Sequence, residues 1–173
     1  GVLATYKASL LNNFVAEQGI ETVLELGCGD GQQLAHARYP LYLGLDVSRR
    51  AIELCEARFA TTVGRSFLWY DPNFTRRLGE FLQADLTMSL DVIYHLVEDK
   101  VYDRYLEDLF ALSRRHVVVY SSNHADGGSL RHVRHRAFAA DVAARFPQFR
   151  LVRHLPNPHR DHSFADFYFF ERE

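Results

Sequence analysis

The chain has 173 residues, which is close to the size of one domain that closes a single hydrophobic core. Its net charge of −2 provides no bulk attraction to nucleic acid or to a membrane surface, so we expect neither as a partner. No apolar run approaches the ~20 residues of a membrane span, and two cysteines do not make a disulfide framework. We therefore expect one domain over residues 1–173, cytoplasmic and with reduced thiols.

Apolar periodicity predicts alternating helices and strands in chain order. The first half is predicted as helix 4–18, strand 22–26, helix 32–38, strand 41–47, helix 48–60, strand 66–70, a short helix near 75–81 and strand 84–90. The second half is predicted as helix 99–112, strand 116–120, helix 131–146 and two strands, 149–154 and 164–171. This alternation indicates an α/β fold with a parallel sheet and helices on both faces. The last two strands have no helix between them and are expected to pair antiparallel.

The strand at 22–26 runs directly into the glycine-rich sequence Gly27-Cys28-Gly29-Asp30-Gly31. Glycines after a strand permit positive φ and let the backbone approach a nucleotide-like ligand closely. Their spacing differs from the GxGxxG of dinucleotide sites, which argues against NAD, FAD or a pyrophosphate ligand.

Two acidic residues flank this turn. Asp46 ends the second strand, where a carboxylate can accept hydrogen bonds from ribose hydroxyls, although a helix cap or a solvated strand end is the plainer interpretation. Glu25 lies within the first strand and faces away from Leu24 and Leu26. A buried carboxylate is costly unless it is paired, so a cationic ligand or a nearby donor is implied.

The sequences VLELGCGDG and GLDVS resemble the first two motifs of class I S-adenosylmethionine-dependent methyltransferases. SLDVIYHLVED resembles a narrower group of small bacterial methyltransferases, and the resemblance continues through VVVYSSN, HVRHRAF and SFADFYFFE. It covers nearly the whole chain. It implies a Rossmann-like, seven-stranded, mostly parallel sheet whose last strand is antiparallel, and S-adenosyl-L-methionine as the cofactor.

The resemblance also implies roles for individual residues. The glycines of the turn would line the methionine and ribose portions, Asp46 would hold the ribose hydroxyls, and Glu25 would support the methionine end. Asp71 matches the position that bonds the adenine amine, but an Asp-Pro-Asn turn explains it equally well. The cofactor-binding residues implied in this way are Glu25, Gly27, Cys28, Gly29, Gly31, Asp46, Val47, Asp71 and Ser89.

The segment after the strand at 84–90 is the expected place for catalysis. Methyl transfer is an in-line displacement, so the protein mainly positions the reactants and removes a proton from an oxygen nucleophile. His95 is the candidate base, and Asp91 is predicted to orient it or to act in its place. Both residues have plainer alternatives: His95 as a core or capping histidine, and Asp91 as a helix N-cap.

Polar residues near the predicted cleft are candidates for binding the methyl acceptor. The residues singled out are Tyr94, Ser122, Asn123, His124, His132 and Arg136. The basic residues would suit an anionic acceptor such as a sugar phosphate, although charge runs on helices are most often simply solvated. No catalytic metal is expected, since the histidine pairs at 132 and 135 and at 159 and 162 lack further ligands at a suitable spacing.

These observations favour O-methylation of a small hydroxylated molecule such as a sugar or a secondary metabolite. N-methylation of another acceptor and a non-catalytic module that binds S-adenosylmethionine are the alternatives. The chain lacks a Gly/Ser-rich stretch before its first helix and has few insertions, and a homodimer is one way to complete its pocket.

Overall fold

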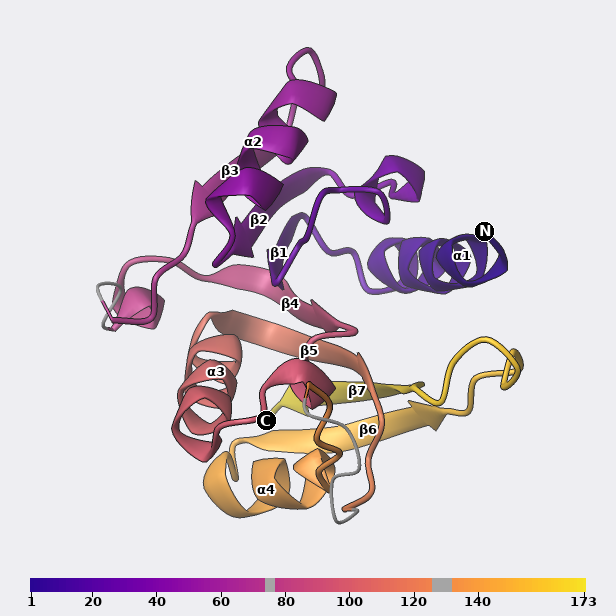
Figure 1. The fold of residues 1–173 in the computed structure, drawn as a ribbon, viewed down its shortest axis with the longest axis vertical. Coiled ribbons are helices and arrows are strands. Elements are labelled where there is room, and N and C mark those ends of the chain that lie inside the picture. The colour runs from indigo at the N-terminus through magenta and orange to yellow at the C-terminus, as the bar shows by residue number, and fades with distance from the viewer. Residues whose placement is uncertain (74–76, 126–131) are drawn as a thin grey trace.

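The computed structural model describes residues 1–73, 77–125 and 132–173. These residues form a seven-stranded sheet in the order β3-β2-β1-β4-β5-β7-β6, and Figure 1 shows the strands following one another down the molecule in that order. The strands are β1 Thr22–Leu26, β2 Leu41–Asp46, β3 Arg65–Trp69, β4 Ala84–Leu90, β5 Ser113–Ser121, β6 Phe149–Leu155 and β7 Asp166–Arg172.

The strand directions confirm the predicted Rossmann-like sheet. Strands β1 to β5 pair parallel with their neighbours, whereas β7 pairs antiparallel with both β5 and β6. The last strand is therefore inserted between β5 and β6. No helix separates β6 from β7, so the chain returns antiparallel through a short loop.

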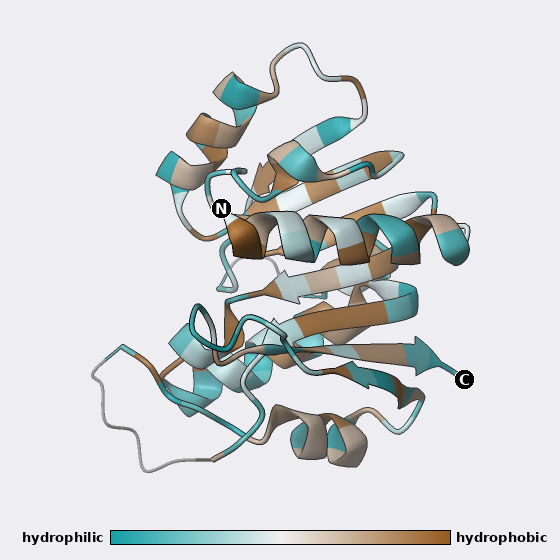
Figure 2. Ribbon diagram, turned by 90° about the vertical axis from the view of Figure 1, so that its right-hand side faces the viewer, coloured by the Kyte–Doolittle hydropathy of each residue, from teal (hydrophilic) through white to brown (hydrophobic). Residues whose placement is uncertain are grey.

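Helices cover both faces of the sheet. The α-helices are α1 Val2–Glu17, α2 Arg49–Arg58, α3 Asp99–Ala111 and α4 Phe138–Arg145, and the single-turn 3-10 helices are η1 Leu34–His36, η2 Leu78–Glu80 and η3 Ile93–His95. Helices α1 and α2 share one core cluster, while α3 and α4 share the other. Figure 2 shows α1 running across the middle strands. Of the helices that the structure describes, none is long and apolar enough to cross a membrane.

The central strands are apolar on both sides because both of their faces are covered. Along β5, Val118 and Tyr120 enter the cluster with α1 and α2, whereas Val117 and Val119 enter the cluster with α3 and α4. All four side chains are fully buried. This explains why β5 is the most β-branched run in the sequence, as expected for a parallel strand between two helical layers.

One predicted helix is much shorter than expected. The helix predicted over 131–146 begins only at Phe138, where Asn123 Oδ1 accepts a hydrogen bond from the Ala139 amide at 3.0 Å. Residues 132–136, which we call the strap, instead lie against the segment after β4. The Arg134 amide donates to the Tyr94 carbonyl at 2.8 Å, and this long-range hydrogen bond takes the place of one within a helical turn.

The two other short predicted helices also differ. The helix predicted over 32–38 is reduced to the single turn of η1. Of the helix predicted near 75–81, the described part is η2, while residues 74–76 lie outside the described ranges. Neither segment is long enough to offset the cost of nucleating an isolated helix.

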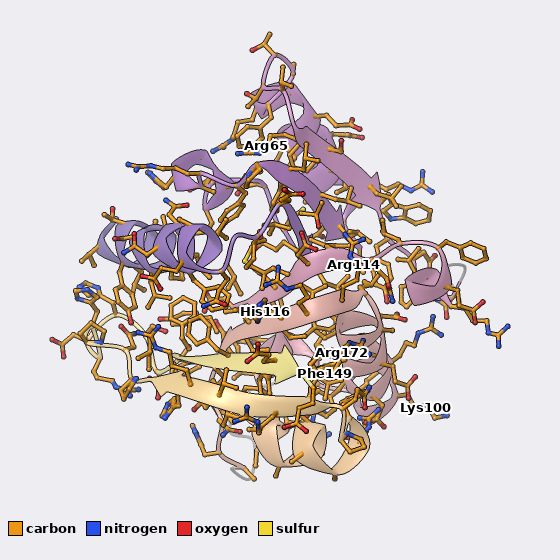
Figure 3. The ribbon with its side chains drawn as sticks, turned by 180° about the vertical axis from the view of Figure 1, so that it is seen from behind. Arg65, Lys100, Arg114, His116, Phe149 and Arg172 are labelled. Carbon is orange, nitrogen blue, oxygen red and sulfur yellow. The ribbon has the colours of Figure 1, made fainter. Side chains whose placement is uncertain are left out.

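The amino ends of the parallel strands are held together by arginines (Figure 3). Arg114 Nη2 donates to Thr22 Oγ1 at 3.1 Å, and Arg172 Nη2 donates to the Ser113 carbonyl at 2.8 Å. Between them His116 is buried on β5, with its ring edge-on to Phe14 of α1 at 5.4 Å. These contacts close the edge of the sheet opposite to the glycine turn.

Candidate functional site

The turn after β1 requires glycine at three positions. Gly27, Gly29 and Gly31 have φ values of +89°, +58° and +77°. A Cβ on Gly27 would lie 2.6 Å from Val92 Cγ2, and one on Gly31 would lie 2.8 Å from Phe59 Cε2. By contrast, a Cβ on Gly29 would meet no atom within 4 Å. The turn is therefore packed tightly at its two ends and open in the middle, as a ligand cradle requires.

Two backbone amides hold the carboxylate of Asp46, one from the glycine turn and one from the start of α2. Its Oδ2 accepts a hydrogen bond from the Gly29 amide at 2.9 Å, and its Oδ1 accepts one from the Ser48 amide at 2.8 Å. Ser48 in turn caps α2 through the Ala51 amide, as its position before the helix predicts. A carboxylate oxygen has two lone pairs, so Asp46 retains the capacity to accept two further hydrogen bonds from a diol.

A cavity of about 200 Å³ opens beside this turn. It lies outside the carboxyl ends of β1 to β4, at the point where the strand order reverses, which is where open α/β sheets bind their ligands. The residues that line the cavity include Gly27, Asp46, Val47, Tyr70, Asp91 and His95. The predicted residues among them come from three separate segments of the chain, and Tyr70, which was not predicted, adds a fourth.

Glu25 is buried beneath the turn, with 4% of its surface exposed. The hydroxyl of Tyr42 on β2 donates to Glu25 Oε2 at 2.7 Å, so the nearby donor implied by the sequence is a tyrosine. Burial raises the pKa of Glu25 from its usual 4.5 to about 7, although the Tyr42 hydrogen bond and the charge of Lys7 act in the opposite direction. The site therefore holds a carboxyl group that lacks a full counter-charge.

Asp91 joins α1 to the cavity. Lys7 Nζ lies 2.7 Å from Asp91 Oδ2, and the Tyr94 hydroxyl donates to Asp91 Oδ1 at 2.7 Å. The backbone of Asp91 has a φ of +61°, which turns the chain sharply at the end of β4. Sequence reasoning missed Lys7; its only signal was a charged residue within an otherwise apolar stretch of the first helix.

His95 lies in η3 and faces the cavity, with its Nδ1 3.3 Å from the carbonyl oxygen of His132 in the strap. A carbonyl oxygen only accepts hydrogen bonds, so Nδ1 carries the proton and Nε2 is left with its lone pair in the neutral ring. We predicted that Asp91 would orient His95, but the observed contacts differ. Asp91 bonds Lys7 and Tyr94, and the strap orients the imidazole.

The remaining predicted cofactor residues occupy different environments. Val47 lines the cavity, whereas the Cys28 side chain is buried in the core below the turn. Ser89 is fully buried, with its Oγ 2.7 Å from the Tyr105 hydroxyl, which itself lines the cavity. Asp71 Oδ1 accepts a hydrogen bond from the Asn73 amide at 2.8 Å, so it forms the turn that its sequence suggested.

The predicted acceptor-binding residues divide into two groups. Ser122 Oγ lies 2.7 Å from His135 Nδ1, and the rings of His135 and His124 stack at 4.7 Å. Arg136, in contrast, is only 8% exposed, and its guanidinium donates to the carbonyls of Leu96 and Val97. Arg136 thus fastens the strap to the cavity wall.

Within the part of the chain that the structure describes, no three His, Cys, Asp or Glu side chains are placed to hold a metal ion. The pairs of histidines along the sequence therefore do not assemble into a larger ligand set among these residues.

We compared the sequence with known protein families and curated proteins, and the fold with solved structures. No protein family model and no curated protein matches the sequence. The methyltransferase domain of bacterial CtHen1-C superposes with a TM-score of 0.75 at 18% identity, covering 98% of each chain. Magnesium protoporphyrin IX methyltransferase from Synechocystis, solved with bound S-adenosylhomocysteine, has a TM-score of 0.75 at 15% identity over 98% of this chain and 83% of that one.

A third similar structure is the N-methyltransferase NodS from Bradyrhizobium japonicum. It has a TM-score of 0.71 at 16% identity and covers 97% of this chain and 93% of that one. At these identities the likeness shows the fold alone, a Rossmann-like fold that this chain shares with these methyltransferase structures. The neighbours differ in what they methylate, so the fold does not identify the acceptor.

Proposed function

We propose that the chain is an S-adenosylmethionine-dependent methyltransferase acting on a hydroxyl group of a small molecule. The observation that carries the proposal is the pairing of the open glycine turn with Asp46, whose carboxylate is held by the Gly29 amide at the mouth of the cavity. A diol and a compact charged group bound side by side would use both features. S-adenosylmethionine carries both of these groups: the ribose supplies the diol, and the methionine end supplies the compact charged group.

The charges around the cavity suit this ligand. The carboxyl groups of Glu25, Asp46 and Asp91 lie close enough to influence one another, and Lys7 is paired with Asp91. The guanidinium of Arg104, which lines the cavity, is paired with Asp108. S-adenosylmethionine carries an ammonium, a carboxylate and a sulfonium, and its net positive charge would offset the excess of acid. When bound, it supplies a methyl group on a good leaving group.

The other end of the cavity suits a nucleobase. Val47, Tyr70 and Pro72 provide a largely apolar wall next to Asp46. Tyr70 is buried, and its hydroxyl donates to Asp108 on α3, which fixes the phenol ring in place. The chain's single tryptophan, Trp69, stands just outside, with its Nε1 donating to the Val47 carbonyl at 3.0 Å and the Arg49 guanidinium 3.8 Å from its ring centroid.

His95 is assigned as the general base. Its Nε2 lone pair is available because Nδ1 donates to the His132 carbonyl. The residue lines the same cavity as Gly27, so an acceptor hydroxyl placed next to the methionine end would lie within its reach. Asp91 is assigned a supporting role: it fixes Lys7 and Tyr94 around the acceptor rather than accepting the proton.

Titration with S-adenosylhomocysteine, followed by the fluorescence of Trp69, tests the cofactor site. We expect micromolar binding, and Asp46→Asn should weaken it at least ~10-fold because an amide replaces one acceptor oxygen with a donor. Asp30→Asn is the matched control, since Asp30 lies in the same turn and its carboxylate accepts hydrogen bonds from Gln32. Absence of binding to the unaltered protein, or equal loss in both variants, would refute the assignment.

A further inference from the structure

Five aromatic or imidazole rings gather beyond the Asp91 side of the cavity, and we call them the ring cluster. They come from four separate segments of the chain: η3, the residues just after β5, the strap, and the loop before β7. The members are Tyr94, His95, His124, His135 and Phe164.

The rings are in contact in a chain. The Tyr94 centroid lies 4.6 Å from that of His95 and 5.0 Å from that of Phe164. Phe164 stands edge-on to His135 at 4.8 Å, and His135 stacks on His124 at 4.7 Å. Edge-on and offset pairs of this kind are the favoured geometries of aromatic rings.

Three members of the ring cluster, His95, His124 and Phe164, are exposed, whereas Tyr94 and His135 are half-buried. Phe164 keeps 48% of its surface accessible, although it follows directly on a polar loop and precedes a strand that is buried. The cluster is also continuous with the cavity, because His95 and Asp91 line the cavity and Asp91 accepts from Tyr94. A surface of aromatic and imidazole rings that borders the proposed reaction site is suited to recognising a substrate.

The neighbouring cations are already engaged. Lys7 is paired with Asp91, and Arg160 Nη2 lies 2.7 Å from Asp166 Oδ1. In the strap, Arg134 and Arg136 both bond Asp99, and Arg136 is buried. Among the residues that the structure describes, these arginines and this lysine are therefore committed to carboxylates. The cationic rim that the sequence suggested for a sugar phosphate is used to hold the fold together.

We infer that the acceptor is an uncharged aromatic compound that carries a hydroxyl group, bound with its ring against the ring cluster and its oxygen toward His95. This inference rests on the proposed function and names its substrate class. In the reaction the acceptor oxygen forms a bond to the methyl carbon while the carbon–sulfur bond breaks and its electron pair passes to sulfur. The hydroxyl proton passes to His95 Nε2.

The test compares two diols of matched size on the unaltered protein. Catechol and trans-cyclohexane-1,2-diol present two adjacent hydroxyls, but only catechol has an aromatic face; phenyl phosphate supplies an aromatic ring with charge. Binding in the presence of S-adenosylhomocysteine is followed by saturation-transfer NMR, and transfer is followed with tritiated S-adenosylmethionine. We expect catechol to bind at least ~10-fold more tightly than either of the others, and to be methylated at least ~10-fold faster than the cyclohexane diol.

Variants locate the effect. Phe164→Ala should raise the KM for catechol at least ~5-fold with little change in kcat, and Phe164→Tyr should restore it because a ring face returns. Phe81→Ala is the matched control, since Phe81 is the most exposed phenylalanine of the described residues and is absent from the ring cluster. S-adenosylhomocysteine binding should be unchanged in all three variants.

The outcomes separate the two proposals. If the protein fails to bind S-adenosylhomocysteine, the proposed function fails. If it binds S-adenosylhomocysteine but prefers the cyclohexane diol or phenyl phosphate, or if Phe164→Ala leaves the KM for catechol unchanged, the aromatic acceptor is overturned while the proposed function stands.

Discussion

The buried carboxyl of Glu25 leads to a stability prediction with a defined pH dependence. Glu25 titrates at about 7 in the folded chain against 4.5 normally, so the folded state keeps its proton to a higher pH than the unfolded state does. Its contribution to stability is complete below pH 4.5 and is lost as the pH rises through 7. The interval corresponds to about 3 kcal/mol, at ~1.4 kcal/mol per pH unit.

Glu25→Gln removes this titration while retaining an oxygen that accepts from the Tyr42 hydroxyl. We expect the variant to exceed the wild type in free energy of unfolding by about 1 kcal/mol at pH 5 and about 3 kcal/mol at pH 8.5, apart from a constant offset. The increase of about 2 kcal/mol between the two pH values corresponds to roughly 4–8 °C in Tm for a chain of this size. The proposed cofactor site predicts that the same variant binds S-adenosylmethionine more weakly, because it lacks the carboxylate assigned to the methionine end.

Urea denaturation of both proteins at the two pH values measures this difference. Glu21→Gln is the matched control, since Glu21 lies four residues earlier and is exposed. A difference between wild type and Glu25→Gln that does not grow with pH would refute the reasoning that Glu25 is buried without full compensation. A difference that grows equally in the control would trace the effect to net charge.

Three further changes test other parts of the structure. His95→Gln should lower kcat by roughly 10²–10⁴ while S-adenosylhomocysteine binding by Trp69 fluorescence stays the same, and a normal rate would exclude His95 as the base. Burial lowers the pKa of His116, so the wild type should lose stability as the pH falls below ~6.5, whereas His116→Phe should lose less; identical acid melting curves would contradict this. Ser48→Ala should cost about 1 kcal/mol in urea unfolding by removing the cap of α2, and a neutral effect would mean that the Ala51 amide finds another acceptor.

Local patterns in the sequence predicted the sheet well because its strands are strongly apolar and are separated by helices. The glycine turn and Asp46 were found for the same reason: both sit at strand ends, and strand ends meet along one edge of a parallel sheet. The predictions of secondary structure were less accurate where contacts with residues far away in the sequence determine the conformation of a segment. Residues 132–137 have helical composition, yet they are not helical, because Tyr94, Leu96 and Val97 supply carbonyl partners from about 40 residues away.

The same limit applies to the site. The exposed Phe164 and the buried Lys7 have no local signature, since their importance arises from neighbours on other elements. Arg136 was expected at the acceptor because its charge was visible in the sequence while its partners were not. In the structure it is buried against Val97 and Asp99, with its guanidinium 4.3 Å from the Tyr102 ring centroid.

The contact between His95 and the strap has a consequence for how the chain tolerates mutation. The group that sets the tautomer of His95 is the main-chain carbonyl at position 132, and every amino acid carries that carbonyl. Replacing the His132 side chain therefore leaves the hydrogen bond available, unlike the loss of a carboxylate partner. The tautomer of His95, the proposed base, therefore depends on the path of the backbone. It is sensitive to displacement of the strap, for example by loss of Arg136, and not to which side chain occupies position 132.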